Sequence, residues 1–268
     1  MKIWLPFLFI YLLTYSNAFG FNSDARSMAL SHSNVAMNTG FNFNENLASM
    51  VNSTFSGFSL THQFNYFVKD LSVSTLQFAQ SINDNSSIQS SIDYSGNKNY
   101  NEINFQLSYG KKIGDKINGG ISLQYHQQQF SDNNYSNFPS ATATIYLFAK
   151  ATDKIHFGCL VDNPTRVKLK NQQNLPSTII GGVSYLPTDK TKIALVAIQQ
   201  NGNEMSYSVG IEYLFLKEFE LRFSYQNKVE SLAAGFSLLV KDYRIEFAFH
   251  TQQPIGNSSC FSLLIPMK

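Results

Sequence analysis

The chain carries little charge for its length. Of its 268 residues, 14% are Asp, Glu, Lys or Arg, whereas a typical soluble domain has about 25%. Hydrophobic residues make up 43% and aromatic residues 14%, and Asn, Gln and Ser supply much of the polarity. This balance is typical of a protein with one face toward lipid and a polar face toward an enclosed lumen. The net charge is +2, and the Lys and Arg residues are scattered along the chain rather than gathered into a stripe. We therefore predict no nucleic-acid partner.

Cysteine is also scarce. The chain has two cysteines, Cys159 and Cys260, in predicted strands that are far apart in strand order. Because a disulfide needs Cα atoms within about 7 Å of each other, we predict two unpaired thiols. Neither cysteine has the sequence neighbours of a nucleophile or of a metal ligand.

Long apolar runs are absent beyond the first part of the chain. Residues 3–15 are apolar, and the next three residues are Ser, Asn and Ala, which places small residues at the −3 and −1 positions of a cleavage after Ala18. An apolar core of about 13 residues is too short to span a bilayer as a helix, which takes about 20. We therefore predict that residues 1–18 are a secretory signal peptide and that the exported chain has no transmembrane helix.

Catalytic motifs are missing as well. The sequence has no Gly-x-Ser-x-Gly, no His-Glu-x-x-His, no phosphate-binding Gly-Lys-Ser/Thr loop and no Cys-x-x-Cys. We predict that the protein is not an enzyme and that it needs no cofactor or metal. An outer-membrane lipase with Ser and His on a barrel wall is the remaining catalytic alternative. The five histidines do not have metal-ligand spacing: His32, His62, His126, His156 and His250.

Tight turns that contain an acidic residue, each with a lysine, recur along the chain. They lie at residues 114–116, 152–154, 188–190, 217–218 and 241–242, and each gap between them holds two strands and one loop. Within residues 219–226, apolar or aromatic side chains alternate with polar ones, which is the period of a strand with two unlike faces. Residues 103–109, 207–215 and 244–250 repeat this alternation. The pattern predicts an up-and-down β-barrel.

The alternating segments number about 14, an even count such as single-chain bacterial barrels have. Most are close to the 9–11 residues that cross a membrane when tilted. We predict an all-β fold, a transmembrane antiparallel barrel over residues 54–268. The expected strands are 54–66, 70–82, 86–95, 101–113, 116–130, 139–150, 154–162, 176–186, 190–200, 204–216, 218–228, 231–240, 242–252 and 257–266.

Turn length predicts the sidedness of this barrel. The tight turns all follow even-numbered strands, whereas the longer connections 131–138 and 163–175 follow odd-numbered ones. Outer-membrane barrels have short periplasmic turns and longer outer loops. We therefore predict an integral protein of the bacterial outer membrane with both termini in the periplasm. Arg166, Lys168 and Lys170 would then lie in an outer loop, where they either contact lipopolysaccharide or remain solvated; the sequence supports both.

The segment from residue 19 to residue 53 lacks strand alternation. Residues 24–37 are rich in small side chains and Met, with only a broken helical periodicity. The segment could lie in the periplasm, form a small exterior helix or fold into the barrel. Because side chains just fill a barrel of eight strands, a wider barrel has an interior to occupy. We predict that residues 19–53 form a hatch, or plug, inside it.

This N-terminal segment carries a family resemblance. Residues 24–30, 34–36 and 46–50 resemble the start of the PorV/PorQ outer-membrane proteins of Bacteroidota, which read Ala-Arg, then a small-apolar run with glycines, Val-Ala and Asn-Pro-Ala. The likeness continues through residues 109–116, 161–164 and 210–213. It implies a FadL-like barrel of 14 strands with an N-terminal hatch that includes Arg26, Asn46, Leu47 and Ala48. Ser31 and His32 replace family glycines, Leu47 replaces the proline, and the last strand lacks a terminal aromatic residue.

The resemblance implies a function. Its leading form is an accessory role in type IX secretion or surface protein attachment, with secretion components or secreted proteins as partners. The alternative is a FadL-like channel for uptake of a small hydrophobic solute. A purely structural barrel or a soluble β-sandwich is the third possibility.

Charged residues on two of the late strands are candidates for the lumen. Glu220, Arg222, Arg244 and Glu246 belong to strands separated by one other, and His250 follows on the polar face of the second. They would form a charge-paired constriction that fixes the plug or selects solute. The alternative is a solvated wall in which each charge has a neighbour of opposite sign.

Overall fold

The computed structural model describes residues 24–38, 43, 46–51, 53, 55–132, 138–167, 175–228 and 230–267. The predicted signal peptide, Lys168 and Lys170 lie outside these residues.

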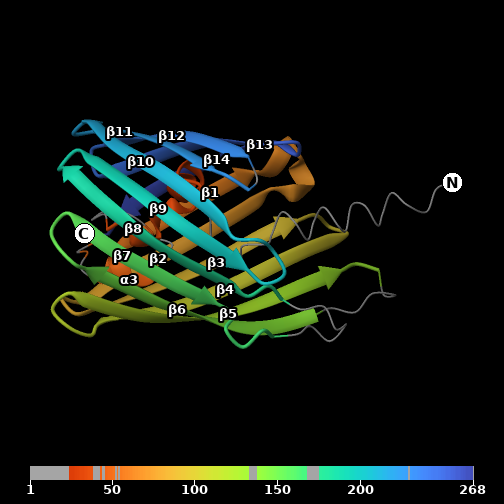
Figure 1. Cartoon of the computed structure of the whole chain (residues 1–268). Helices are drawn as coiled ribbons and strands as arrows, with labels where there is room; N and C mark the ends of the chain where they lie inside the picture. Colours follow the sequence, from red (N-terminus) through yellow and green to blue (C-terminus); the bar gives the residue numbers. More distant parts are fainter. Residues whose placement is uncertain are drawn as a thin grey trace.

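Fourteen antiparallel strands form a closed barrel, which confirms the predicted fold class (Figure 1). Each strand pairs with its neighbours in sequence, and β1 closes the barrel against β14. The strands are β1 Gly57–Phe64, β2 Val73–Asn83, β3 Ser86–Gly96, β4 Tyr100–Lys112, β5 Ile117–Phe130, β6 Phe138–Lys150, β7 Ile155–Asp162, β8 Thr178–Thr188, β9 Thr191–Gln200, β10 Ser206–Leu216, β11 Phe219–Gln226, β12 Ser231–Val240, β13 Tyr243–Gln252 and β14 Gly256–Pro266.

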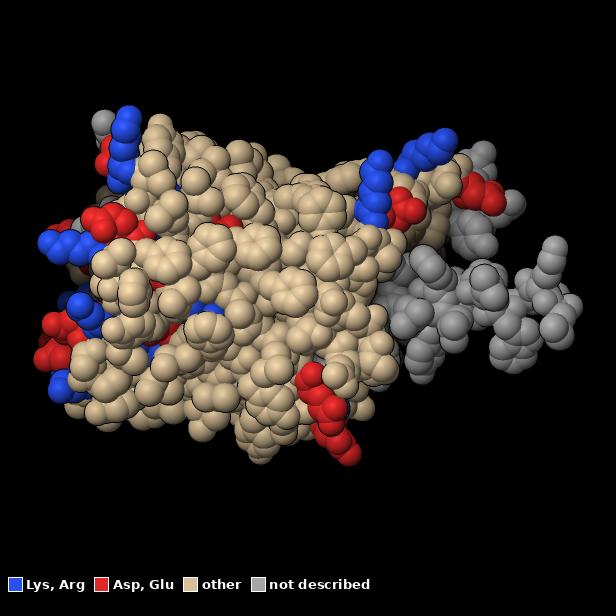
Figure 2. Space-filling model, turned by 90° about the horizontal axis from the view of Figure 1, so that it is seen from above, with Lys and Arg blue, Asp and Glu red and all other residues tan. Residues whose placement is uncertain are grey.

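The outer surface of the wall is apolar. Every strand exposes at least one large hydrophobic side chain, because alternate residues of a strand point to opposite faces. Figure 2 shows one side of this surface, where charged side chains gather at the two ends and few lie in the band between them. Such a band is what a bilayer requires of a barrel that spans it. Examples from successive strands are Leu60, Leu76, Ile92, Leu107, Leu123, Leu147, Phe157, Ile179, Leu195, Ile211, Phe223, Leu232, Phe249 and Phe261.

The two ends of the barrel differ in their connections. The acidic tight turns follow β4, β6, β8, β10 and β12, and this end is called the short-turn end. The connections β1–β2, β5–β6 and β7–β8 are longer and lie at the opposite, long-loop end. Lys150 Nζ lies 3.1 Å from Asp153 Oδ1 in one tight turn, and this contact lowers the pKa of the Asp153 carboxyl. β14 ends with Pro266 at the short-turn end.

Among the residues that the structure describes, three short helices precede the strands, and they lie inside the barrel. They are α2 Ala25–Ala29, the 3-10 helix η1 Ser33–Ala36 and α3 Leu47–Met50, and the described residues 24–38, 43 and 46–51 are called the inner segment. α2 packs against β11–β14, η1 against β7–β10 and α3 against β4–β6. In the described part of the chain, no helix is long and apolar enough to cross a membrane.

Candidate functional site

The inner segment rests on glycines of the barrel wall. These glycines point into the lumen from six different strands, and a Cβ atom on most of them would collide with the inner segment. Because glycine has no Cβ, it allows this close approach of another backbone. An added Cβ would lie 2.1 Å from Val35 O at Gly158, 3.1 Å from Val35 Cγ1 at Gly182, 2.1 Å from Ser33 Oγ at Gly210, 2.6 Å from Ala29 Cβ at Gly235, 2.8 Å from Val51 Cγ2 at Gly110 and 3.5 Å from Leu47 Cδ2 at Gly120.

Hydrogen bonds from the wall reach the backbone of the inner segment. The helices are too short to satisfy most of their own carbonyl groups, and wall side chains supply donors instead. Ser184 Oγ donates to Ala36 O at 2.7 Å, Ser208 Oγ to Ser31 O at 2.8 Å, Ser224 Oγ to Ala29 O at 2.9 Å and Asn118 Nδ2 to Ala48 O at 3.0 Å.

Asn46 joins two parts of the inner segment to the wall. Its Oδ1 accepts from Ala48 N at 3.1 Å and caps α3. Its Nδ2 donates to Val35 O at 2.9 Å and to Leu147 O at 2.8 Å. Leu47 and Ala48 are buried beside it. Three of the four predicted hatch residues therefore lie together, whereas the fourth, Arg26, lies in α2.

Arg26 enters a buried ionic cluster on the wall. Its Nε lies 2.8 Å from Glu212 Oε2, which also accepts from Arg222 Nε at 2.9 Å. Glu212 Oε1 accepts from Lys192 Nζ at 2.7 Å. One carboxylate that is 2% exposed therefore meets three cations, one from the inner segment and two from the wall.

The predicted lumen charges complete this cluster. Arg222 Nη2 lies 2.7 Å from Glu220 Oε2 and 3.2 Å from Glu246 Oε1, and Arg244 Nη1 lies 3.1 Å from Glu220 Oε2. Arg222 and Glu246 are 0% exposed, so this part of the wall is buried rather than solvated. His250 shares the inward face of β13 with Glu246 but lies four residues further along, which is about 13 Å at 3.3 Å per residue.

The sequence analysis did not identify two members of the cluster, Glu212 and Lys192, or the nearby Asp24. Glu212 stands within the alternating segment 207–215, and its register opposite Arg222 and Lys192 was the signal that would have found it. Asp24 caps α2, where its Oδ1 accepts from Ser27 N at 2.7 Å. Burial raises the pKa of its carboxyl, although the Ser27 bonds and the nearby Arg26 and Arg222 oppose that rise.

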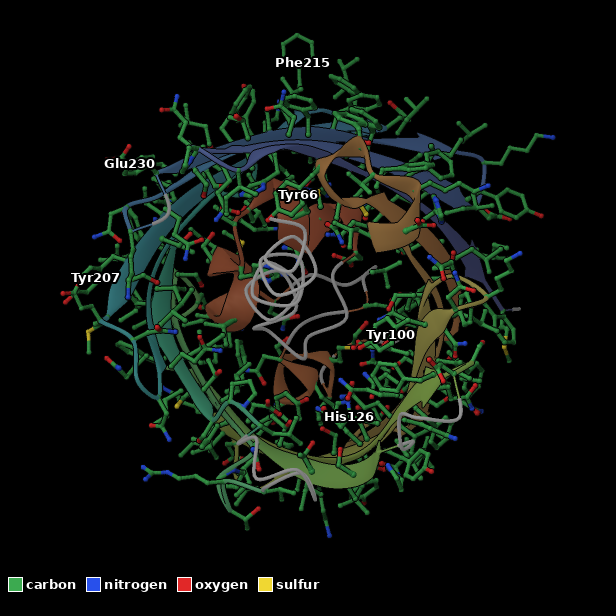
Figure 3. The ribbon with its side chains drawn as sticks, turned by 90° about the vertical axis from the view of Figure 1, so that its right-hand side faces the viewer. Tyr66, Tyr100, His126, Tyr207, Phe215 and Glu230 are labelled. Atoms are coloured by element: carbon green, nitrogen blue, oxygen red, sulfur yellow. The ribbon has the colours of Figure 1, made fainter. Side chains whose placement is uncertain are left out.

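The half of the lumen toward the long loops has a different lining. Tyr66, Tyr100 and His126 point into the lumen from different parts of the wall (Figure 3). Carboxylates there accept from neutral donors. Asp93 accepts from Thr75 Oγ1 at 2.7 Å and from Asn104 Nδ2 at 3.0 Å, Glu102 from Tyr100 Oη and from Gln128 Nε2 at 3.1 Å, and Asp162 from Thr144 Oγ1 at 2.6 Å.

The β1–β2 connection turns inward over this half. Tyr66 and Phe67 have φ angles of 53° and 54°, a left-handed conformation that non-glycine residues seldom adopt. Tyr66 is held there because its N donates to Ser258 Oγ at 3.0 Å and its Oη donates to Gln252 Oε1 at 3.3 Å. Partial burial raises the pKa of the Tyr66 hydroxyl. Phe67 beside it is 59% exposed.

Comparison with known proteins identifies the fold. No family model and no curated protein matches the chain by sequence. Among solved structures, the toluene transporter TodX of Pseudomonas putida aligns with a TM-score of 0.66 and 10% identity over 91% of this chain and 96% of its own. The toluene transporter TbuX of Ralstonia pickettii aligns with a TM-score of 0.60 and 13% identity over 91% of this chain and 97% of its own. A FadL homologue of Pseudomonas aeruginosa aligns with a TM-score of 0.60 and 10% identity over 90% of this chain and 97% of its own.

These matches confirm the fold that the resemblance implied, a barrel like those of FadL-type proteins. Identities of 10% and 13% show a shared fold and no more. Membership of the PorV/PorQ family stays a prediction.

Proposed function

We propose that the protein is an outer-membrane channel for the uptake of small hydrophobic solutes. The observation that carries the proposal is the shared architecture: a closed barrel of 14 strands whose chain aligns over 91% of its length with a protein described as a toluene transporter. The apolar outer band supports a position in a membrane, with the short-turn end toward the periplasm. The predicted secretion role stays a hypothesis, since none of the contacts described above favours it.

In this proposal the inner segment is the plug. A solute first meets exposed apolar side chains at the long-loop end, such as Phe67 and Val68. It then enters the half of the lumen toward the long loops and reaches a segment that is anchored to β4–β14. Because this segment is closely fitted to the wall, the solute proceeds when the segment shifts, or it leaves sideways into the lipid.

A reversible lock on the inner segment tests the proposal. Ser31 Oγ and Ser224 Oγ lie 2.7 Å apart, so Ser31→Cys with Ser224→Cys places two thiols at a separation from which a disulfide can form. Cys159→Ala and Cys260→Ala remove the native thiols. In host cells that have no hydrocarbon channel of their own, we expect toluene accumulation that stops on oxidation of the lock and returns on reduction.

Each outcome of the lock experiment has a defined meaning. The two single-cysteine variants are the controls, and they should take up toluene under both redox conditions. Uptake by the unlocked protein equal to that of host cells without it would contradict the channel. Uptake that persists in the oxidised double variant would keep the channel and assign exit to the barrel wall.

A further inference from the structure

The two ends of the inner segment are held to the wall by different kinds of contact. η1 and α3 pack into a large apolar cluster with wall side chains such as Phe148. The buried apolar cluster around α2 is smaller, and its wall members in the described chain are Ala248 and Cys260. Leu30, which follows α2, adds one larger apolar side chain beside Ala194. Because apolar burial stabilises in proportion to the area removed from water, it seats η1 and α3 more firmly than α2.

Polar contacts supply much of the attachment of α2. Besides the bond from Ser224 described above, Ala25 N donates to Ser262 Oγ at 2.9 Å, and Arg26 Nε donates to Glu212 Oε2 at 2.8 Å. Water can replace the partner in each of these contacts, so a neutral one contributes little net free energy, and one to a charged group contributes more. The pair of Arg26 and Glu212 is therefore the strongest polar contact that holds α2.

The wall keeps its charges paired when Arg26 is taken away. Glu212 retains Lys192 Nζ at 2.7 Å and Arg222 Nε at 2.9 Å. Arg26 would leave together with Asp24, the cap of α2, with which it interacts electrostatically. Breaking a buried ion pair is costly mainly when it leaves an unpaired charge behind, and here it does not. The wall part of the cluster consists of three cations and three anions: Lys192, Arg222, Arg244, Glu212, Glu220 and Glu246.

The junction between α2 and η1 is strained. Ser31 and His32 have φ angles of 44° and 59°, so two consecutive non-glycine residues are left-handed. Such conformations persist where the surroundings enforce them. Here the wall holds Ser31, because its Oγ lies 2.7 Å from Ser224 Oγ and its carbonyl accepts from Ser208 Oγ at 2.8 Å. Departure of α2 would relieve this strain, and residues at the ends of elements are where hinges absorb changes in φ and ψ.

We propose that the inner segment opens at one end: residues 24–30 leave the wall about a hinge at Ser31 and His32, with Arg26 as the latch, whereas η1 and α3 stay seated. The inference rests on the proposed uptake function, for which it names the part of the plug that moves. The path that opens lies along β11–β14, the strands against which α2 packs.

Cys260 is a native reporter of this movement. It is 1% exposed and lies beneath α2, so a water-soluble thiol reagent reaches it when α2 leaves; Cys159→Ala removes the other thiol. A second reporter, Ser87→Cys with both native cysteines changed to alanine, places one thiol beneath the end of α3. Ser87 is 3% exposed, its Oγ has no hydrogen bond within the described chain, and it lies beside Gly110, on which Val51 packs.

The test measures how fast methanethiosulfonate ethylammonium modifies each thiol in the purified, folded barrel in detergent. Each rate is divided by the rate in the urea-unfolded chain, which removes differences in reactivity between the two thiols. We expect this ratio to be at least about tenfold higher for Cys260 than for the Ser87→Cys reporter, since apolar contacts that water cannot replace cover the latter.

Variants of the latch make the test specific. Arg26→Met removes one charge-assisted hydrogen bond and should raise the rate at Cys260 about tenfold, without changing the rate at the Ser87→Cys reporter. Arg26→Lys keeps the charge and should raise the rate at Cys260 less. Arg166→Met is the matched control, because it makes the same change in the exposed β7–β8 connection, and it should alter neither rate. Heat-modifiable migration on a gel shows that each variant is folded.

Equal ratios at the two thiols, equal acceleration of both by Arg26→Met, or no acceleration at Cys260 would each overturn the proposal. The first comparison needs no change at Arg26, so it decides the question even where that variant does not fold. Toluene uptake is measured separately in the same variants. Uptake together with equal ratios at the two thiols disproves only this inference. Selective modification of Cys260 without any toluene uptake disproves the channel and leaves the hinged movement standing.

Discussion

The two halves of the lumen are lined by the same strands but differ in what occupies them. Toward the short-turn end, the inner segment lies on Gly158, Gly182 and Gly210, and its Arg26 joins a buried ionic cluster. Toward the long-loop end, the wall presents Glu102 and Tyr100, which remain partly exposed. Small wall residues therefore accompany a closely fitted protein segment, and larger polar and aromatic ones line the half toward the long loops.

This difference separates the tasks of the wall. Where the inner segment is seated, charges are paired with opposite charges, because a buried charge without a partner is costly. Toward the long-loop end, Asp93 and Glu102 accept hydrogen bonds from the neutral side chains of Asn104 and Gln128. Changes in the half that holds the inner segment should therefore affect stability more than changes toward the long-loop end.

The largest effect is expected from Glu212→Gln. The substitution leaves Arg26, Arg222 and Lys192 without the carboxylate that they share. Breaking a buried ion pair by removing one partner costs about 3–5 kcal/mol, so the free energy of unfolding should fall by about this amount. Urea unfolding of the barrel in detergent micelles measures it.

Two further variants make the test of the cluster specific. Glu218→Gln, in the exposed β10–β11 turn, should leave the free energy of unfolding almost unchanged. Arg26→Met combined with Glu212→Gln should cost less than the sum of the two single changes, because each removes the same interaction. Additive losses would show that Arg26 and Glu212 do not interact.

A smaller loss is expected from Gly158→Ala. The new Cβ would lie 2.1 Å from Val35 O and 2.8 Å from Ala36 Cα, which are backbone atoms that cannot rotate away. Overpacking of this kind costs about 1–3 kcal/mol, and here it should also release the inner segment to added protease. Gly181→Ala is the control, since its Cβ meets nothing within 4 Å. Equal protease resistance in both variants would contradict a close fit.

The pH dependence of stability should change in Asp24→Asn. Burial raises the pKa of the Asp24 carboxyl in the folded protein above its ordinary value of 3.8. Folding therefore favours the protonated form, and the corresponding stability is present below pH 3.8 and is lost as the pH rises through the raised pKa. The asparagine keeps the cap oxygen without titrating. Relative to the variant, the wild-type protein should lose stability as the pH rises, which urea titrations over a pH series detect; parallel curves would contradict it.

Much of the barrel could be predicted from local sequence. Each strand has one face toward lipid and one toward the lumen, so a segment such as residues 219–226 must alternate. Predicting the ionic cluster requires more than local sequence. Glu212 meets Arg222 because β10 and β11 pair in one register, and it meets Arg26 because the inner segment takes one path across the lumen. That segment has no regular periodicity that would predict its path across the lumen. The position of Gly158 within a predicted strand does not indicate which residues it contacts.

The smallest effect is expected from relief of backbone strain, which can be compared at the two ends of the barrel. Lys241, in the exposed β12–β13 turn, has a φ of 57°. This conformation costs an L-residue roughly 1–2 kcal/mol, and glycine avoids it at an entropic cost of about 0.5–1 kcal/mol. Lys241→Gly should therefore raise the free energy of unfolding by about 0.5 kcal/mol. Tyr66 has a φ of 53° and is strained in the same way, but its hydroxyl donates to Gln252 at the end of β13. Tyr66→Gly should not stabilise the protein, because the lost contact offsets the relief. A higher free energy of unfolding in both variants would mean that the contacts of Tyr66 do not stabilise the protein.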